Sequence, residues 1–276
     1  MSVNNTPAWP WHSVPDVVAQ SVESRLCSEL RAGKVFLLVD PIAGVDDFDA
    51  FMDLPQFPLD AASLRLQQKH TPFLLALPDR HDASLMRSVH IAILEQLKLY
   101  RHGKGVLRVG GWLQHVDQDG QALAEQLTRL FQLERPRMGV SWLRLADRRV
   151  LEMLHRGQKQ SRPALLPLMD WPSLLGESIP CWSYLDRNFT VRTLHGKPGK
   201  PSGNHLSFPA PYWQLLGRST TLSELLTRWH GRQHPLPEDA MGQVLLMLRR
   251  LEREHPDWAS ERIVADANAR LVAGKP

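Results

Sequence analysis

The chain has 276 residues, and 33 Lys and Arg against 29 Asp and Glu give a net charge of +4 with neutral histidines. A hydrophobic fraction of 43% and a charged fraction of 22% are those of a folded globular protein and exclude a disordered chain. No basic run exceeds two consecutive residues, so the sequence lacks the basic stripe typical of proteins that bind phosphate backbones.

Targeting and metal-binding patterns are missing from the sequence. The first residues have neither the basic nor the apolar region of a secretory signal, and no apolar run reaches the roughly 18 to 20 residues that span a bilayer. Cys27 and Cys181 are too few for a disulfide framework, and the twelve histidines form no HxH or HExxH motif. We therefore expect a cytoplasmic protein without a metal or cofactor.

The first half of the sequence alternates amphipathic helices with short apolar strands. Apolar residues recur every four positions in the helices, whereas the strands are nearly continuous apolar runs. The pattern predicts helices at 13–33, 82–102, 121–133 and 147–154, and strands at 34–40, 72–77, 106–113 and 140–146. Segment 46–60 is expected to be a loop that can include a helical turn. Gly110 and Gly111 predict a bulge, or a close backbone approach, beside Trp112.

The second half has a different pattern. Strands at 179–186 and 189–195 are expected to form a hairpin, because polar and apolar residues alternate on either side of an Asp-Arg-Asn turn. Residues 195–204 are rich in Gly, Pro and Lys and predict a flexible loop. Capping residues and apolar periodicity then predict three helices, at 222–229, 237–251 and 257–271.

These elements together predict an α+β protein in which helices pack against one sheet. We expect an α/β-like lobe at residues 1–160, with a mixed sheet flanked by helices. Residues 161–276 are expected to form a mainly helical C-terminal lobe, with the hairpin, the flexible loop and a three-helix bundle.

Two candidate chemistries follow from polar residues in loops. Asp40 and Asp46 follow the first strand, where carboxylates can act as bases or hold Mg²⁺, and His81 lies between two acids. A hydrolase or nucleotide-processing enzyme is therefore the alternative function, although the phosphate-loop, GxGxxG and GxSxG motifs are missing. Lys197 and Lys200 give a weaker third hypothesis, a nucleic-acid contact without interleaved aromatic residues.

Nine tryptophans are the least ordinary feature of the composition. Those in predicted strands, including Trp112, are expected to lie in the core. Four others stand in proline-bounded loops, where they are candidates for contacts with a partner protein, with packing between the lobes as the alternative. These four candidates are Trp9, Trp11, Trp171 and Trp213.

An ordered pattern around residues 106–155 resembles the domain of type VI secretion effector chaperones. A strand with Gly111-Trp112-Leu113 is followed by a helix at 123–131 and then by Trp142-Leu143-Arg144-Leu145-Ala146-Asp147-Arg148-Arg149-Val150-Leu151. The strands at 34–40 and 71–74 fit the opening of that domain, and Leu165–Leu168 with Trp182–Leu185 fit its close. The similarity covers residues 34–190.

The resemblance implies a non-catalytic adaptor that binds a secreted toxin and helps to load it onto a VgrG-type spike protein. It implies neither a cofactor nor a contact with membranes. Trp112, Arg144, Asp147 and Arg149 correspond to structural signature residues. Arg148 stands where the family has proline, so the following helix lacks a preset φ angle, although Asp147 can still cap it. Arg144 can pair with Asp147 or with Asp40.

Overall fold

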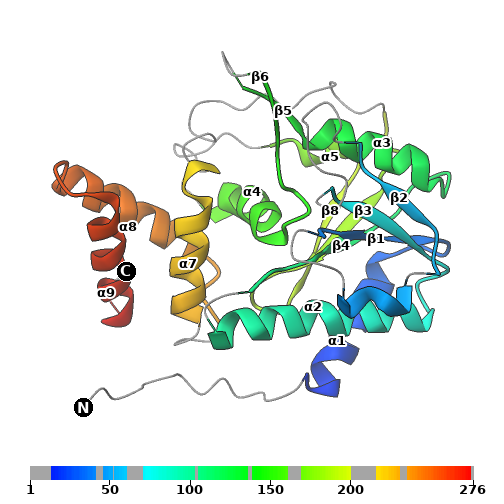
Figure 1. Ribbon diagram of the computed structural model, residues 1–276, viewed down its shortest axis with the longest axis horizontal. Helices are drawn as coiled ribbons and strands as arrows, with labels where there is room; N and C mark the ends of the chain where they lie inside the picture. Colours follow the sequence, from blue (N-terminus) through cyan, green and yellow to red (C-terminus); the bar gives the residue numbers. More distant parts are fainter. Residues whose placement is uncertain are drawn as a thin grey trace.

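A six-stranded antiparallel sheet forms the centre of the molecule, in the order β2-β3-β1-β4-β7-β8 (Figure 1). The computed structural model describes residues 14–41, 46–51, 53–60, 71–102, 105–135, 139–160, 169–199, 216–230 and 235–274. The strands of the sheet are β1 (Val35–Val39), β2 (Gln56–Pro58), β3 (Phe73–Leu77), β4 (Val109–Leu113), β7 (Cys181–Leu185) and β8 (Val191–His195). The α+β fold class is therefore confirmed.

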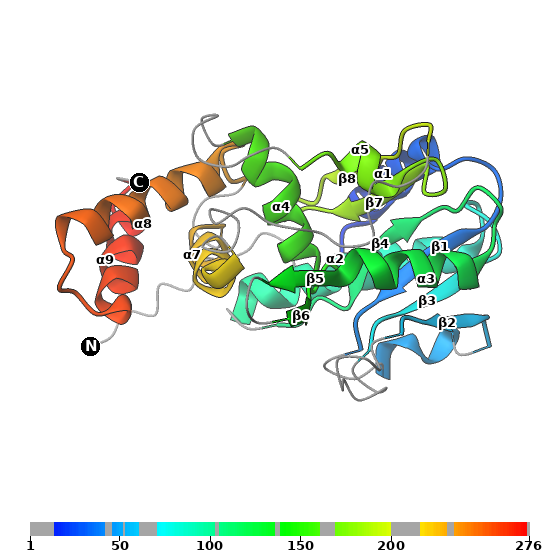
Figure 2. The same cartoon turned by 90° about the horizontal axis from the view of Figure 1, so that it is seen from above.

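Helices cover both faces of the sheet. One face carries α1 (Asp16–Glu29), α2 (Ala83–His102) and the 3-10 helix η1 (Asp46–Phe51), and the other carries α3 (Gly120–Phe131), α4 (Arg148–Gln160) and α5 (Trp171–Leu175) (Figures 1 and 2). All of β1 is buried because its alternate side chains serve the two faces. Val35, Leu37 and Val39 pack toward α1 and α2, whereas Phe36 and Leu38 pack toward α3 and α4.

The strand pairs of this sheet are antiparallel, whereas a mixed sheet was expected. Helix α2 does connect two parallel strands, β3 and β4, as a helical crossover requires. Strand β1 lies between them and runs antiparallel to both. The expectation of a mixed sheet was therefore wrong, because the helical crossover passes over an intervening strand.

A second, two-stranded sheet projects from the molecule beside α4 (Figure 1). It consists of β5 (Gln132–Arg135) and β6 (Gly139–Trp142), and it is called the β5–β6 ribbon below. The expected helix at 121–133 thus ends at Phe131, and the expected strand at 140–146 is shorter and pairs outside the main sheet. Strand β2, within the segment expected to be a loop, adds an edge strand to the main sheet.

The expected bulge at the double glycine is confirmed. The register between β1 and β4 shifts by one residue, because Leu38 pairs with Gly111 and Val39 pairs with Val109. A Cβ atom on Gly110 would lie 2.6 Å from the carbonyl oxygen of Ala146. The missing side chain at Gly110 therefore allows the chain that precedes α4 to lie directly on β4.

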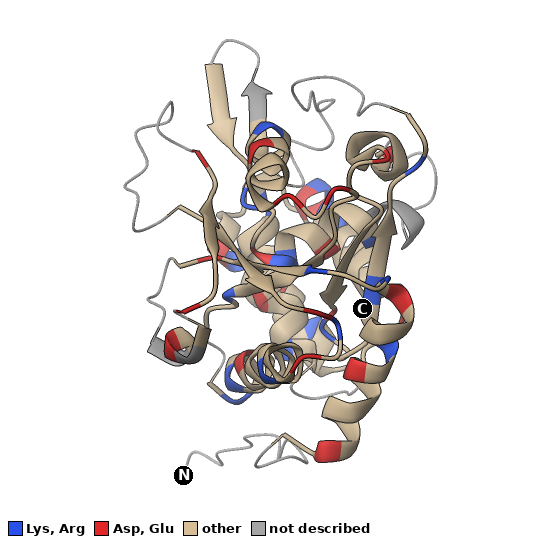
Figure 3. Cartoon of the chain, turned by 90° about the vertical axis from the view of Figure 1, so that its right-hand side faces the viewer, with Lys and Arg blue, Asp and Glu red and all other residues tan. Residues whose placement is uncertain are grey.

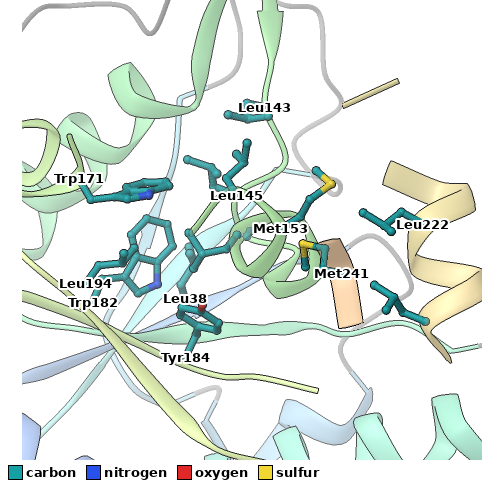
Figure 4. Close-up of a cluster of buried hydrophobic side chains, with 14 of the residues drawn as sticks. Leu38, Leu143, Leu145, Met153, Trp171, Trp182, Tyr184, Leu194, Leu222 and Met241 are labelled. Atoms are coloured by element: carbon teal, nitrogen blue, oxygen red, sulfur yellow. The ribbon is translucent and has the colours of Figure 1, made fainter. Parts of the chain in front are cut away.

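The three helices expected near the C-terminus are α7 (Ser219–His230), α8 (Ala240–Glu254) and α9 (Ser260–Val272). They pack against one another, and α4 and α2 connect them to the sheet. One core runs without interruption from Tyr184 of the sheet through Met153 of α4 to Leu222 and Met241 of the helical region (Figure 4). The β7–β8 hairpin, which was assigned to the C-terminal lobe, is part of the central sheet.

No helix in the described ranges is both long and apolar enough to cross a membrane.

A substitution at Gly111 tests how closely the bulged strand β4 packs against β7. Its φ angle is +139°, and a Cβ atom would clash with the carbonyl oxygen of Ser183 on β7. We expect Gly111→Ala to lower the free energy of unfolding by about 3 kcal/mol, from backbone strain and overpacking together. Gly139→Ala is the matched control, because Gly139 also has a positive φ but open space around it. Urea unfolding measures both, and equal losses would contradict the close contact.

Candidate functional site

Three of the four predicted signature residues meet at the junction between β6 and α4. The Arg144 Nη2 atom lies 2.8 Å from Asp40 Oδ2 and 4.0 Å from Asp147 Oδ2. Both pairings that the sequence left open therefore occur, and the closer one joins the junction to the end of β1. Asp40, Arg144, Asp147 and Arg149 are called the signature cluster below.

Asp147 holds the start of α4. Its Oδ1 atom accepts a hydrogen bond from the Arg149 backbone N–H at 3.0 Å, which is an N-cap contact. The Arg149 guanidinium also donates from Nε to Oδ1 at 2.9 Å and from Nη2 to Oδ2 at 2.7 Å. Burial raises the pKa of Asp147, but the hydrogen bonds and charge of Arg149 and the charge of Arg144 outweigh it and hold the pKa below its ordinary value.

The cluster is buried on its acidic side and open on its basic side. The side chains of Asp40 and Asp147 are 3% and 6% exposed, whereas those of Arg144 and Arg149 are 42% and 27% exposed. The carboxylates therefore anchor the cluster to the protein, and guanidinium N–H groups form its outer surface.

The exposed side of the cluster faces a cleft of about 650 Å³. One wall consists of Ser141 and Trp142 of β6 together with the signature residues from Arg144 onward. The opposite wall is α7, with Thr220 and Glu224 among its residues. A cleft of this size lies within the range of sites that bind ligands or peptide side chains. Because one wall lies at residues 141–150 and the other at residues 216–227, packing rather than local sequence creates the cleft.

Trp112, the fourth signature residue, lies elsewhere. Its ring is fully buried on the face of the sheet covered by α1 and α2, and its indole N–H donates to Ser88 Oγ at 2.8 Å. The expectation that it belongs to the core is confirmed. Its contribution to the cleft is indirect, through the bulged strand that also carries Gly110.

The loop tryptophans give no exposed anchor in the described ranges. Trp171 begins α5 and is 3% exposed in the core above the sheet, near Trp182 (Figure 4). This position matches the packing alternative, so Trp171 offers no surface to a partner in this structure. Trp9, Trp11 and Trp213 lie outside the described residues, and their partner contacts stay predictions.

Arg148 has a structural role that the sequence did not predict. Its side chain is buried beside the signature cluster, where Nη2 donates to the Ala92 carbonyl at 2.6 Å and lies 4.0 Å from Glu95. Its Nε and Nη1 atoms have no hydrogen-bond partner in the part of the chain that the structure describes. Glu95 also accepts hydrogen bonds from Arg108 Nε and the backbone N–H of Val109. Arg148 is thus a buried cation facing a buried carboxylate.

The residues of the enzyme alternative are not brought together in the described contacts. Asp40 is buried and pairs with Arg144. His81 lies on an exposed turn, where its ring nitrogen accepts a hydrogen bond from Arg80 Nε at 3.1 Å. The side chain of Asp46 lies outside the described residues.

Of the two lysines in the nucleic-acid hypothesis, one pairs with an acid and the other lies outside the described residues. Lys197 pairs with Asp170 at 3.2 Å, and Lys200 lies outside the described ranges. The backbone of the predicted flexible loop is held as far as residue 199. Gly196 and Lys197 donate to the carbonyls of Pro180 and Pro172, and the Gly199 carbonyl accepts a hydrogen bond from the Glu177 N–H. Basic and acidic positions alternate over the elements visible in Figure 3, which is unlike a continuous basic track.

The described residues contain no group of three or more His, Cys, Asp or Glu placed to hold a metal ion. Comparison of the chain with protein-family models, with curated proteins and with solved structures finds no match in any of the three.

The lowered pKa of Asp147 predicts an acid-dependent loss of stability. A carboxylate with a depressed folded-state pKa stabilises the protein above its unfolded pKa of about 3.9, and this contribution disappears as the pH falls through the folded value. We expect Asp147→Asn to be less stable than wild type by about 2 kcal/mol at pH 7 and by progressively less below pH 4. Urea unfolding at a series of pH values measures the difference. A difference independent of pH would contradict the assignment.

Glu95 and Arg148 predict a second effect on stability. Glu95→Gln keeps the size of the side chain but leaves Arg148 buried without an opposite charge, so we expect a loss of about 3 kcal/mol in unfolding experiments. The double variant Glu95→Gln, Arg148→Met should be more stable than Glu95→Gln alone, because it removes the uncompensated cation. A double variant with no recovery would show that the two charges do not depend on each other.

Proposed function

We propose that this protein is a non-catalytic adaptor that binds a secreted effector in the cytoplasm and helps to load it onto a VgrG-type spike protein. The proposal combines the resemblance to type VI secretion effector chaperones with the position of the signature residues. The observation that carries it is the placement of Arg144, Asp147 and Arg149 along one wall of an open cleft. Residues that the resemblance marks as structural thus shape a surface on which another chain can lie.

The chemistry of the cleft supports binding rather than catalysis. A general base needs a carboxylate or imidazole that can exchange a proton near the operating pH. Asp147 instead has a lowered pKa and both of its oxygens are occupied by Arg149, while Asp40 is held by Arg144. These carboxylates fix the positions of Arg144 and Arg149, and arginines held in place can bind a partner.

The helical region that includes the α7 wall is also anchored to the sheet. Arg156 of α4 donates to Asp186 at the end of β7 at 3.1 Å and to the carbonyl of Glu238, just before α8, at 3.1 Å. Asp186 is fully buried and also accepts hydrogen bonds from Arg192 and two backbone N–H groups. Arg156 therefore joins the helical region to the sheet, through a hydrogen bond to the Glu238 carbonyl and a buried ion pair with Asp186. A preformed cleft loses little conformational entropy on binding.

The adaptor function is tested by filling the cleft from its α7 wall. Thr220 is exposed and lines the cleft, so Thr220→Trp adds bulk at a helix surface without disturbing the core. For an effector bound with micromolar to nanomolar affinity, about 8 to 12 kcal/mol, we expect at least tenfold weaker binding. The measurement is co-purification and titration calorimetry with a toxin encoded beside the protein's gene. Ala265→Trp, at an exposed position of α9, a helix that does not line the cleft, is the matched control and should bind as wild type does.

Two outcomes would count against the adaptor. If wild type binds neither a neighbouring toxin nor a spike protein, the function is wrong. If Asp40→Asn or His81→Ala abolishes function while the complex still forms, the enzyme alternative gains support. Asparagine is preferred at position 40 because it keeps a hydrogen-bond acceptor for Arg144.

A further inference from the structure

Strand β6 has one edge paired with β5 and one edge directed away from it. The Leu143 N–H donates to the Phe131 carbonyl at 2.7 Å, just beyond the ribbon and in the same register. Hydrogen-bonded and non-hydrogen-bonded positions alternate along an antiparallel pair. Ser141 therefore bonds to β5, whereas the backbone N–H and C=O groups of Val140 and Trp142 point outward.

Among the residues that the structure describes, none gives this outward edge the protection that the other strand edges have. Natural proteins shield edges with proline, charged residues, short strands or a covering helix. In the main sheet, edge strand β2 is three residues long and ends in Pro58, and edge strand β8 carries Arg192 and is contacted by α1 and α5. Strand β5 carries Glu134 and Arg135 in its sequence, but β6 reads Gly-Val-Ser-Trp, and Val140 is 42% exposed.

The cleft runs beside this unprotected strand. Ser141 and Trp142 of β6 belong to its wall, and α7 stands opposite, so there is space next to β6 for a further extended chain. A two-stranded ribbon is only marginally stable, and a third strand would stabilise it. Peptides that add to a sheet edge gain affinity from backbone hydrogen bonds and specificity from alternate side chains.

The charges at the end of β6 indicate what this chain carries. The signature cluster presents the guanidinium groups of Arg144 and Arg149 to the cleft, while its own carboxylates are buried. An acidic side chain reaching this end would meet the guanidinium N–H groups that Asp40 and Asp147 leave unused, and charge-assisted hydrogen bonds of this kind are strong. Glu224, exposed on the opposite wall, repels an acid placed on that side. The contact with Arg144 and Arg149 therefore favours an acidic side chain at one position along the added strand.

We propose that an extended segment of the protein cargo adds to β6 as a third strand of the β5–β6 ribbon, with an Asp or Glu side chain at Arg144 and Arg149. This inference rests on the proposed adaptor function, because the strand comes from the cargo. It goes further by defining the recognised element as a backbone edge with one acidic side chain.

Proline substitution separates the two edges of the ribbon. Val140→Pro removes an outward N–H that β5 does not use, and proline is tolerated at strand edges. We expect it to weaken binding of the toxin encoded beside the gene at least tenfold without lowering the melting temperature. Glu134→Pro is the matched control, because Glu134 is the register partner of Val140 and its N–H also points away from the ribbon, on the other edge. Val140→Ala, which keeps the N–H, should bind as wild type does.

A second measurement tests the backbone directly and does not depend on folding of a variant. Synthetic peptides tiled along the toxin identify the bound segment by fluorescence anisotropy with the wild-type protein. Backbone N–H groups of an added strand point alternately toward β6 and away from it. N-methylation of one alternating set of residues (one phase) should therefore abolish binding, and N-methylation of the other set should leave binding intact. Exchange of the acidic residue for its amide should weaken binding at least fivefold.

The outcomes separate this inference from the adaptor function. If wild type and Val140→Pro bind the toxin equally, or if both phases of N-methylation are tolerated, strand addition is wrong while the adaptor function stands. If wild type does not bind the toxin, both are overturned.

Discussion

The close approach of the chain before α4 to the bulged strand β4 is the contact on which the rest of the site depends. Gly110 has no side chain, so the Ala146 carbonyl can lie where a Cβ atom would otherwise be. That approach places Arg144 within reach of Asp40 at the end of β1, and it sets the point where α4 begins. The β5–β6 ribbon precedes this segment and α4 follows it, so a displaced backbone here would move both the strand edge and the helix that supports α7. The missing Cβ atom of Gly110 thus makes the position of the cleft wall depend on the sheet.

The charges around this contact follow a consistent division. Carboxylates lie inside, as Asp147 and Glu95 do, and arginines either satisfy them from within or extend toward the cleft. Arg148 is the internal case and Arg149 the external one, although they are adjacent in sequence, because successive helix residues point about 100° apart. Buried ion pairs contribute little net stability, since desolvation offsets their attraction. Their contribution here is geometric, because they fix where the outer guanidinium groups stand.

Elements defined by local periodicity were predictable, and those defined by distant packing were not. Val18, Val22 and Leu26 predicted α1, because apolar residues at four-residue spacing lie on one face of a helix. Strand β5 was missed because Gln132–Arg135 has the composition of a helix end and no breaker separates it from α3. Strand β6 was expected but placed in the wrong sheet, since apolar alternation says nothing about which strand lies alongside. The sequence offered Asp40 and Asp147 as alternative partners of Arg144 without choosing between them, because a charge pattern does not show which carboxylate lies closer. The opposite wall of the cleft was not predicted, since contacts far along the chain position α7.

The connection between β4 and β7 has a consequence for the order in which the molecule assembles. These strands are neighbours in the sheet, yet α3, the ribbon, α4 and α5 all lie between them in sequence. Closing a long chain segment costs conformational entropy before its contacts form, and pairings with high contact order form slowly. Strands β3, β1 and β4 are nearer in sequence and leave the ribosome first. The α7 wall of the cleft, at residues 216–227, is synthesised after all of these strands, so the cleft is completed late in the synthesis of the chain.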